Sequence, residues 1–208
     1  NKVLLGMSGG VDSSVAAALL KEQGYEVVGI TMILCGGNDS TTCMSSNIIT
    51  DAKKICDKLN IEHHVLNLKD EFKKYVIDNF IECYQNCKTP NPCIECNKYM
   101  KFGFMYQKAK ELGCDYIATG HYAKTEHKDG KVYLLKAKDL NKDQSYFLNQ
   151  LSQEQLDKVL FPLCDIEKPK VREIAEKLDL INAKKKDSTG ICFIGERNFR
   201  EFLKNYLP

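Results

Sequence analysis

The sequence predicts an α/β fold, a parallel twisted sheet with helices on both faces, followed by a smaller, mostly helical segment. The chain has 208 residues, of which 43% are hydrophobic and 28% charged, and this balance is typical of a globular protein. In its first half, short apolar runs alternate with segments of helical period, as they do where crossing helices join parallel strands. A glycine-rich turn follows the first apolar run, at the place where such sheets bind ligands.

Residues 1–145 are predicted to repeat strands and helices. Apolar runs predict strands at residues 3–7, 27–34, 64–68 and 115–120. Apolar periodicity predicts one helix that ends at Gly24 and others at residues 48–59, 72–84 and 99–112. We interpret this part as a nucleotide-binding domain.

The pattern changes after Ala123. Residues 124–138 predict a β-hairpin that turns at Asp129-Gly130. Helices are predicted near residues 153–159 and 170–180. We place a soft boundary near residue 145, so that residues 146–208 form a helical segment.

The last residues predict one more helix. Its apolar face has helical spacing and consists of Phe199, Phe202, Leu203 and Tyr206. Such a face is expected to dock on the rest of the protein.

Several classes of protein are excluded by composition. No apolar run approaches the roughly 18 residues of a membrane span, and no export signal opens the chain. The net charge of +2 is too small to predict a polyanionic partner by itself. Ten cysteines in a chain of this length are expected to be mostly reduced thiols and not a disulfide framework.

The turn after the first strand has the composition of an anion-binding loop. It reads Ser8-Gly9-Gly10-Val11-Asp12-Ser13-Ser14. The two glycines allow backbone N–H groups to converge, and the helix that follows adds its positive N-terminal dipole. Asp12 would repel a bare phosphate, which predicts a Mg²⁺ ion on a pyrophosphate group. The alternative is an ordinary turn with Asp12 or Ser13 as the helix cap.

This loop resembles the SGGxDS signature of the ATP pyrophosphatases, which cleave ATP between its α and β phosphates. The resemblance implies that residues at the carboxyl edge of the sheet bind ATP. The expected ATP-binding residues are Gly6, Met7, Ser8, Gly9, Gly10, Val11, Asp12, Ser13, Met32 and Gly120. Met32 would pack on the adenine, and Gly120 would allow close approach. His121, directly after it, is a candidate contact for phosphate or an RNA base.

Two segments present cysteines that carry chemistry. Cys93 and Cys96 form a CxxC after two prolines, which predict a rigid loop and not a helix. A structural zinc site would need a second such pair, and none is found. Cys192 follows three lysines at positions 184–186, whose charge favours its thiolate and also suits an RNA backbone. The alternative for Cys192 is a small buried hydrophobic residue.

Five strings in this order resemble the tRNA-specific 2-thiouridylases, a family of the ATP pyrophosphatase superfamily. They are SGGVDSS, NPCIECNKYMKFG, ATGHYA, KDQSYFL and DSTGICFIGER. The resemblance implies an adenine nucleotide alpha hydrolase-like, Rossmann-like fold and a cytoplasmic enzyme without a membrane partner. It implies that ATP and Mg²⁺ adenylate the wobble uridine of a tRNA anticodon loop. A cysteine desulfurase or a sulfur carrier would deliver the sulfur.

The resemblance also implies roles for single residues. Asp12, Cys96 and Cys192 would be catalytic, with Cys192 carrying sulfur as a persulfide and Cys96 as its partner. Three residues would line the target base, namely Asn91, Pro92 and Cys93. The run Lys142-Asp143-Gln144 would touch the tRNA. The alternative for that run is a helix start with Asp143 as its cap.

The sequence departs from the pattern of the family in two ways. Many members carry Asp where Cys93 stands, so Cys93, Cys96 and Cys192 are an alternative ligand set for a [4Fe–4S] cluster that carries hydrosulfide on its open iron. The family also continues into C-terminal β domains that are absent from this chain, which is therefore expected to be part of a longer protein. Other hypotheses are a different ATP pyrophosphatase, or a structural metal-binding or RNA-binding module.

Overall fold

The protein contains a five-stranded parallel sheet, which confirms the predicted α/β fold. The computed structural model describes residues 1–35, 46–187, 190–195 and 199–204. The strand order is β3-β2-β1-β4-β7. The strands are β1 (Lys2–Gly6), β2 (Glu26–Ile33), β3 (Glu62–Asn67), β4 (Tyr116–Ala118) and β7 (Val159–Leu160). The order reverses between β1 and β4, so the loops that leave these strands diverge and form a crevice at the carboxyl edge.

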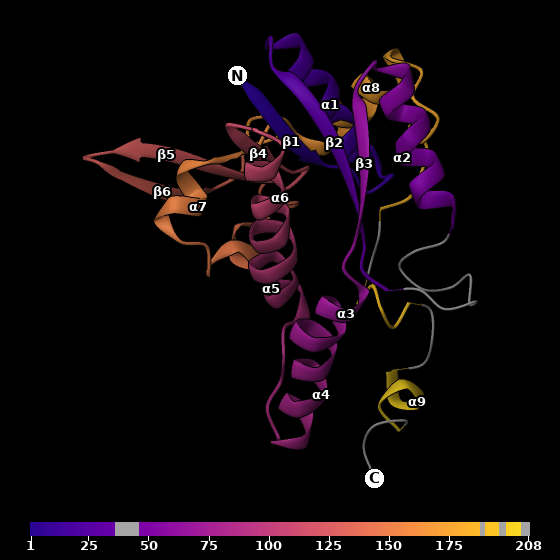
Figure 1. Ribbon diagram of the computed structural model, residues 1–208, viewed down its shortest axis with the longest axis vertical. Coiled ribbons are helices and arrows are strands. Elements are labelled where there is room, and N and C mark those ends of the chain that lie inside the picture. The colour runs from indigo at the N-terminus through magenta and orange to yellow at the C-terminus, as the bar shows by residue number, and fades with distance from the viewer. Residues whose placement is uncertain (36–45, 188–189, 196–198, 205–208) are drawn as a thin grey trace.

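Helices cover both faces of the sheet (Figure 1). Successive strand residues point to opposite faces, and Leu4 and Leu5 of β1 accordingly belong to different cores. Leu5 packs with α1 (Val11–Glu22) and α2 (Ser46–Lys58). Leu4 packs with α6 (Met105–Glu111). A further helix, α8 (Lys168–Lys177), packs on α1 through Val171 and Val15.

A helical part extends beyond the carboxyl edge of the sheet (Figure 1). It contains α3 (Lys69–Phe72), the π-helix η1 (Lys73–Ile77), α4 (Asp78–Gln85), α5 (Pro92–Glu95), the π-helix η2 (Cys96–Phe104) and α9 (Phe199–Lys204). The rings of Phe199 and Phe202 contact Phe80 of α4 at centroid distances of 6.2 and 6.4 Å. The predicted docking of the terminal helix is therefore confirmed, while Tyr206 lies outside the described residues.

The second half of the chain differs in part from its prediction. The hairpin is confirmed as β5 (Ala123–Lys128) and β6 (Lys131–Lys136). The predicted helix at 153–159 is shorter: α7 (Gln153–Asp157) begins with a capping box of Ser152 and Gln155, and β7 follows it. Since β7 pairs with β4, residues after position 145 belong to the same sheet as those before it. A short 3₁₀ helix, η3 (Ser145–Leu148), lies between the hairpin and α7.

No helix within the described residues is both long enough and apolar enough to span a bilayer.

Candidate functional site

The loop between β1 and α1 leaves the helix start open to an anion. Gly9 has a φ of 69°, a conformation that favours glycine. Gly10 is the N-cap of α1 and no side chain caps it, so the alternative of Asp12 or Ser13 as the cap is wrong. The Ser8 hydroxyl accepts a hydrogen bond from Gly10 N at 3.3 Å and lies 3.2 Å from the Ser13 hydroxyl. Backbone N–H groups of the first turn and two hydroxyls are thus gathered at one helix start.

Gly120 brings the end of β4 against this loop. A Cβ atom at position 120 would lie 2.8 Å from Ser13 N and 2.9 Å from the carbonyl carbon of Asp12. Both distances are shorter than normal contacts, so no larger residue fits without a backbone shift. Gly120 was expected to allow close approach, and in the structure it allows the loop after β4 to approach the loop before α1.

Met32 lies on β2 beyond the end of β1. Met7 N donates to Ile30 O, and Leu68 N donates to Ile33 O. Because neighbouring residues of a strand direct their backbone groups to opposite sides, Met32 directs its N–H and C=O toward the β1 side, past Gly6, where β1 ends. These groups are placed for hydrogen bonds to the edge of a planar ring in the crevice.

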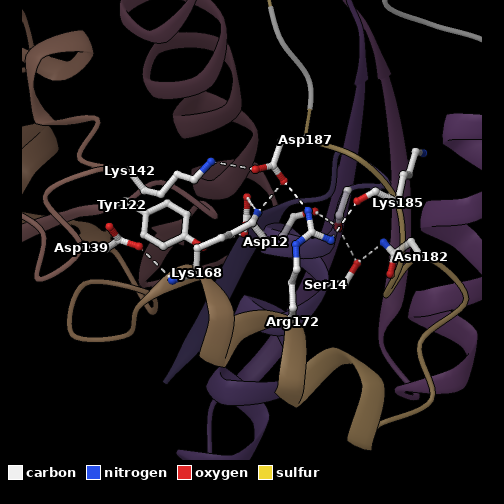
Figure 2. Close-up of polar contacts among 12 residues, drawn as sticks. Asp12, Ser14, Tyr122, Asp139, Lys142, Lys168, Arg172, Asn182, Lys185 and Asp187 are labelled. Atoms are coloured by element: carbon white, nitrogen blue, oxygen red, sulfur yellow. Dashed lines mark hydrogen bonds and ion pairs between the residues drawn. The ribbon is translucent and has the colours of Figure 1, made fainter.

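The Asp12 carboxylate is held by residues from two distant parts of the chain (Figure 2). Lys168 Nζ donates to its two oxygens at 2.7 and 2.9 Å, and the Tyr122 hydroxyl donates to Oδ1 at 2.8 Å. Lys168 is only 7% exposed. Burial, and then the charge of Asp12, raise the pKa of Tyr122, so the phenol stays protonated.

Asp187 binds three cations at the same place (Figure 2). Its Oδ1 accepts from Lys168 at 2.8 Å and from Arg172 at 2.9 Å, and its Oδ2 accepts from Lys142 at 2.9 Å. Burial alone raises the pKa of Asp187, but the hydrogen bonds from Lys168 and Lys142 outweigh it and lower the pKa to about 2. Lys142, which was predicted to touch tRNA, is therefore paired within the chain.

Asp143 and Gln144 hold the loops near Tyr122 together. Asp143 accepts from Ala137 N at 2.9 Å and from the Ser145 hydroxyl at 2.7 Å. Gln144 Oε1 accepts from Tyr122 N at 3.1 Å. Gln144 is the N-cap of η3, so the alternative of Asp143 as a helix cap is wrong.

His121 is buried and 8% exposed. Its Nδ1 lies 2.7 Å from the Thr119 hydroxyl, and its ring contacts Phe102 and Phe161. Burial, followed by the charge of Lys101, lowers the pKa of His121 well below its usual value. The imidazole is therefore neutral at pH 7 and offers no positive charge to a phosphate.

The CxxC lies on a helix, so its predicted placement in an extended loop is wrong. Asn91 is the N-cap of α5 and Pro92 occupies the first turn, where a proline needs no N–H partner and its fixed φ suits a helix. Cys93 lies on α5, and Cys96 begins η2. Cys96 is buried in a cluster that also holds Phe193 and the terminal helix residue Phe202.

Cys192 lies close enough to the CxxC to interact with it electrostatically. Cys192 as a whole residue is exposed, but desolvation of its thiol, and then the neighbouring Cys96 and Cys93, raise the pKa to about 12, against an opposing effect of Lys101. Burial also raises the pKa values of Cys93 and Cys96. The expectation that the lysines at 184–186 favour a Cys192 thiolate is wrong, because Lys185 instead donates to Gly9 O at 3.3 Å.

The described residues hold no group of three or more His, Cys, Asp or Glu side chains arranged to bind a metal ion. Cys93, Cys96 and Cys192 are thus near enough to interact electrostatically, but they are not arranged around a single metal ion.

Sequence reasoning missed four residues of this site. They are Tyr122, Lys168, Arg172 and Asn182. Asn182 Nδ2 donates to Gly9 O at 3.1 Å and to the Ser14 hydroxyl at 2.9 Å. Lys168 and Arg172 lie in a segment of alternating charges, a pattern that predicts a solvent-exposed helix. A single Asn such as Asn182 belongs to no recognisable motif. Only the string ATGHYA could have drawn attention to Tyr122.

A helix start without a side-chain cap, at the point where the strand order reverses, is typical of nucleotide-binding α/β proteins. The chain belongs to the family described as the tRNA methyl transferase HUP domain, whose sequence pattern matches residues 1–196.

Curated relatives match over the whole chain. A tRNA-specific 2-thiouridylase MnmA of Proteus mirabilis is 56% identical over 209 aligned residues, and one of Staphylococcus epidermidis is 53% identical. These alignments cover 100% of this chain but 57% and 56% of the relatives. The chain therefore spans little more than half the length of these proteins.

Solved structures share the fold at low identity. A 4-thiouridine synthetase–RNA complex with bound ATP has a TM-score of 0.63 and 18% identity, over 100% of this chain and 50% of that one. The U34-tRNA thiolase NcsA from Methanococcus maripaludis, with its [4Fe-4S] cluster, has a TM-score of 0.55 and 21% identity, over 98% and 64%.

Proposed function

We propose that this chain is the catalytic part of an enzyme that uses ATP to convert the wobble uridine of tRNA to 2-thiouridine. The observation that carries the proposal is that Ile191 and Phe193, on either side of Cys192, pack in the same cluster as Cys96, which lies 96 positions before Cys192. Met32 packs against the cluster that holds Cys96 and Phe193, and also against the sheet core. The names of the curated relatives support the same activity.

The first step takes place at the helix start of α1. The hydroxyls of Ser8 and Ser13 and the N–H groups after Gly10 bind the phosphates, and the Met32 backbone binds the adenine edge. Mg²⁺, held near Asp12, would neutralise the pyrophosphate group. The O2 atom of the uridine attacks the α-phosphate, pyrophosphate leaves, and an adenylated base results.

The second step uses two thiols. Cys192 receives sulfur from a donor protein as a persulfide. Its terminal sulfur attacks C2 of the base, and AMP leaves. Cys96 then attacks Sγ of Cys192, which forms a Cys96–Cys192 disulfide and leaves the sulfur on the base as 2-thiouridine. An external thiol reduces the disulfide. Because the pKa of Cys192 is about 12 in this conformation, tRNA or the donor must change its surroundings before it reacts.

The tRNA is proposed to enter with its wobble base turned out of the anticodon loop, as a single-stranded target allows. Asn91, Pro92 and Cys93 lie at the helix start that precedes Cys96 and would line that base. Three residues would contribute to tRNA binding by holding the nearby loops in position, namely Lys142, Asp143 and Gln144. His121 would contribute as a neutral group. A cysteine desulfurase or a sulfur carrier would supply the sulfur in the cytoplasm.

The experiment follows 2-thiouridine by mass spectrometry of tRNA digests, with ATP, Mg²⁺, a desulfurase and cysteine. We expect thiolation by the wild type and by Cys93→Ala, and its loss in Cys96→Ala and Cys192→Ala. Cys164→Ala is the matched control, since this cysteine lies outside the cluster. Retained thiolation in Cys192→Ala would contradict the persulfide route.

The cluster alternative has its own readout. Anaerobically purified protein is analysed for iron and acid-labile sulfide. About four irons per chain that are lost in Cys93→Ala, together with lost thiolation, would support a [4Fe–4S] enzyme. We expect no iron.

A further inference from the structure

Three basic side chains from two elements converge beside the phosphate loop (Figure 2). Lys168 and Arg172 lie one turn apart on α8, and Lys142 comes from the loop before η3. All three contact one carboxylate, that of Asp187, at 2.8 to 2.9 Å. No phosphate-loop motif in the sequence includes any of them.

The cluster is built to hold its position. Asp139 Oδ2 accepts from Lys168 N at 2.9 Å and so fixes the first turn of α8. Arg172 also donates to Ala183 O at 3.2 Å and to Lys185 O at 3.0 Å. Only 9% of the Lys168 side chain is exposed. Lys168 and Arg172 are therefore preorganised, whereas exposed lysines sample many rotamers.

The three cations outnumber the two carboxylates even with Asp187 in place. Three cations face Asp187 and Asp12, so the removal of the Asp187 carboxylate would leave an excess of two positive charges next to an open helix start. Two oxygens that accept from three cations resemble two oxygens of a phosphate group. Lys168 contacts both Asp187 and Asp12, which makes the cluster continuous with the α1 N-terminus.

We propose that Lys142, Lys168 and Arg172 form a second phosphate subsite, which Asp187 occupies in the nucleotide-free protein and from which the pyrophosphate part of ATP displaces it. The inference rests on the proposed function and deepens it. Asp187 precedes Cys192 by five positions. Its displacement releases the attachment of the Cys192 segment to α8, so that thiol delivery follows nucleotide binding.

The test measures the binding of inorganic pyrophosphate with Mg²⁺ by calorimetry. Asp187→Asn keeps the size of the side chain and removes the competing charge, so pyrophosphate should bind about tenfold more tightly. Lys142→Ala, at a side chain that is 43% exposed, should bind it about tenfold more weakly. The control is Asp165→Asn, which breaks another carboxylate–lysine pair, with Lys124, and should bind as the wild type does.

A second readout follows Cys192 itself. Its alkylation by iodoacetamide, read by peptide mass spectrometry, should accelerate when pyrophosphate is added to the wild type. In Asp187→Asn it should be fast without pyrophosphate.

Unchanged or weaker pyrophosphate binding by Asp187→Asn would overturn the subsite, as would wild-type binding by Lys142→Ala. If the subsite fails while tRNA is thiolated, the proposed function stands. If the binding changes appear and no 2-thiouridine forms, the subsite stands and the proposed function fails.

Discussion

Lys168 Nζ lies 2.7 Å from Oδ1 of Asp12, although the two residues are 156 positions apart. The acid of the phosphate loop is therefore neutralised by the first turn of α8. The pair orients the Asp12 carboxylate together with the Tyr122 hydroxyl. The orientation of the Asp12 carboxylate therefore depends on α8, a helix that the sequence of the phosphate loop does not predict as its partner.

Lys168→Met should destabilise the protein strongly. The change removes the partner of two carboxylates, and loss of one member of a buried ion pair typically costs 3–5 kcal/mol. Because Asp12 and Asp187 are both 32% exposed, we expect the lower end, about 3 kcal/mol, in urea unfolding. Lys170→Met, on the same helix and 55% exposed, is the control and should change stability by less than about 0.5 kcal/mol. Equal effects of the two changes would contradict the importance of the Lys168 pair.

Gly120→Ala should impair nucleotide binding more than folding. The added Cβ would meet Ser13 N at 2.8 Å, and overpacking of this kind costs about 1–3 kcal/mol. The backbone shift falls on the start of α1, so ATP affinity measured by calorimetry should fall at least about tenfold. Normal ATP affinity in a folded Gly120→Ala protein would show that this start is not the phosphate site.

The reaction of Cys192 with iodoacetamide should rise with pH without a plateau up to pH 9. Only the thiolate reacts, and with a pKa of about 12 the thiolate fraction grows about tenfold per pH unit over this range. Peptide mass spectrometry separates Cys192 from the other cysteines. A plateau below pH 9 would show a much lower pKa and contradict the increase that desolvation and the neighbouring Cys96 and Cys93 cause.

The stabilising effect of Asp187 should disappear in acid. Its folded pKa of about 2 lies below the unfolded value of about 3.9. The ionised group therefore stabilises the folded state above about pH 4, and this contribution is lost as pH falls toward 2. The difference in unfolding free energy between wild type and Asp187→Asn should shrink over that range. For Asp179→Asn, at a fully exposed side chain, the difference should stay small throughout, and a parallel pH profile for the two variants would contradict the role of the three cations.

The sheet and its phosphate loop could be predicted because their signals are local. Apolar runs mark β1 to β4, and a turn such as Ser8-Gly9-Gly10 depends on neighbouring residues only. The strand β7 escaped prediction because Val159 and Leu160 alone are too short to show alternation. They also follow the helical residues of α7 directly, and their strand conformation comes from pairing with β4.

The site was predicted less completely because its contacts are long-range. Charge at positions 184–186 predicts an ionised Cys192, but Lys185 turns to Gly9 and Asp51, and desolvation raises the pKa of the thiol. The CxxC was assigned to a loop because Pro90 and Pro92 interrupt the pattern, whereas Pro92 in fact begins a helix. His121 looked accessible in the sequence, and the packing of Phe102 and Phe161 buries it.

The separation of Asp12 from Lys168 also bears on synthesis at the ribosome. The phosphate loop emerges with the first residues, while Lys142, Lys168 and Arg172 follow only after β4 and the hairpin have been made. A nascent chain that ends at β4 thus carries the loop without its cations, and Asp12 has no basic partner from α8. Since N-terminal parts of proteins begin to fold during synthesis, the site closes late, and nucleotide cannot stabilise the incomplete chain through these three side chains.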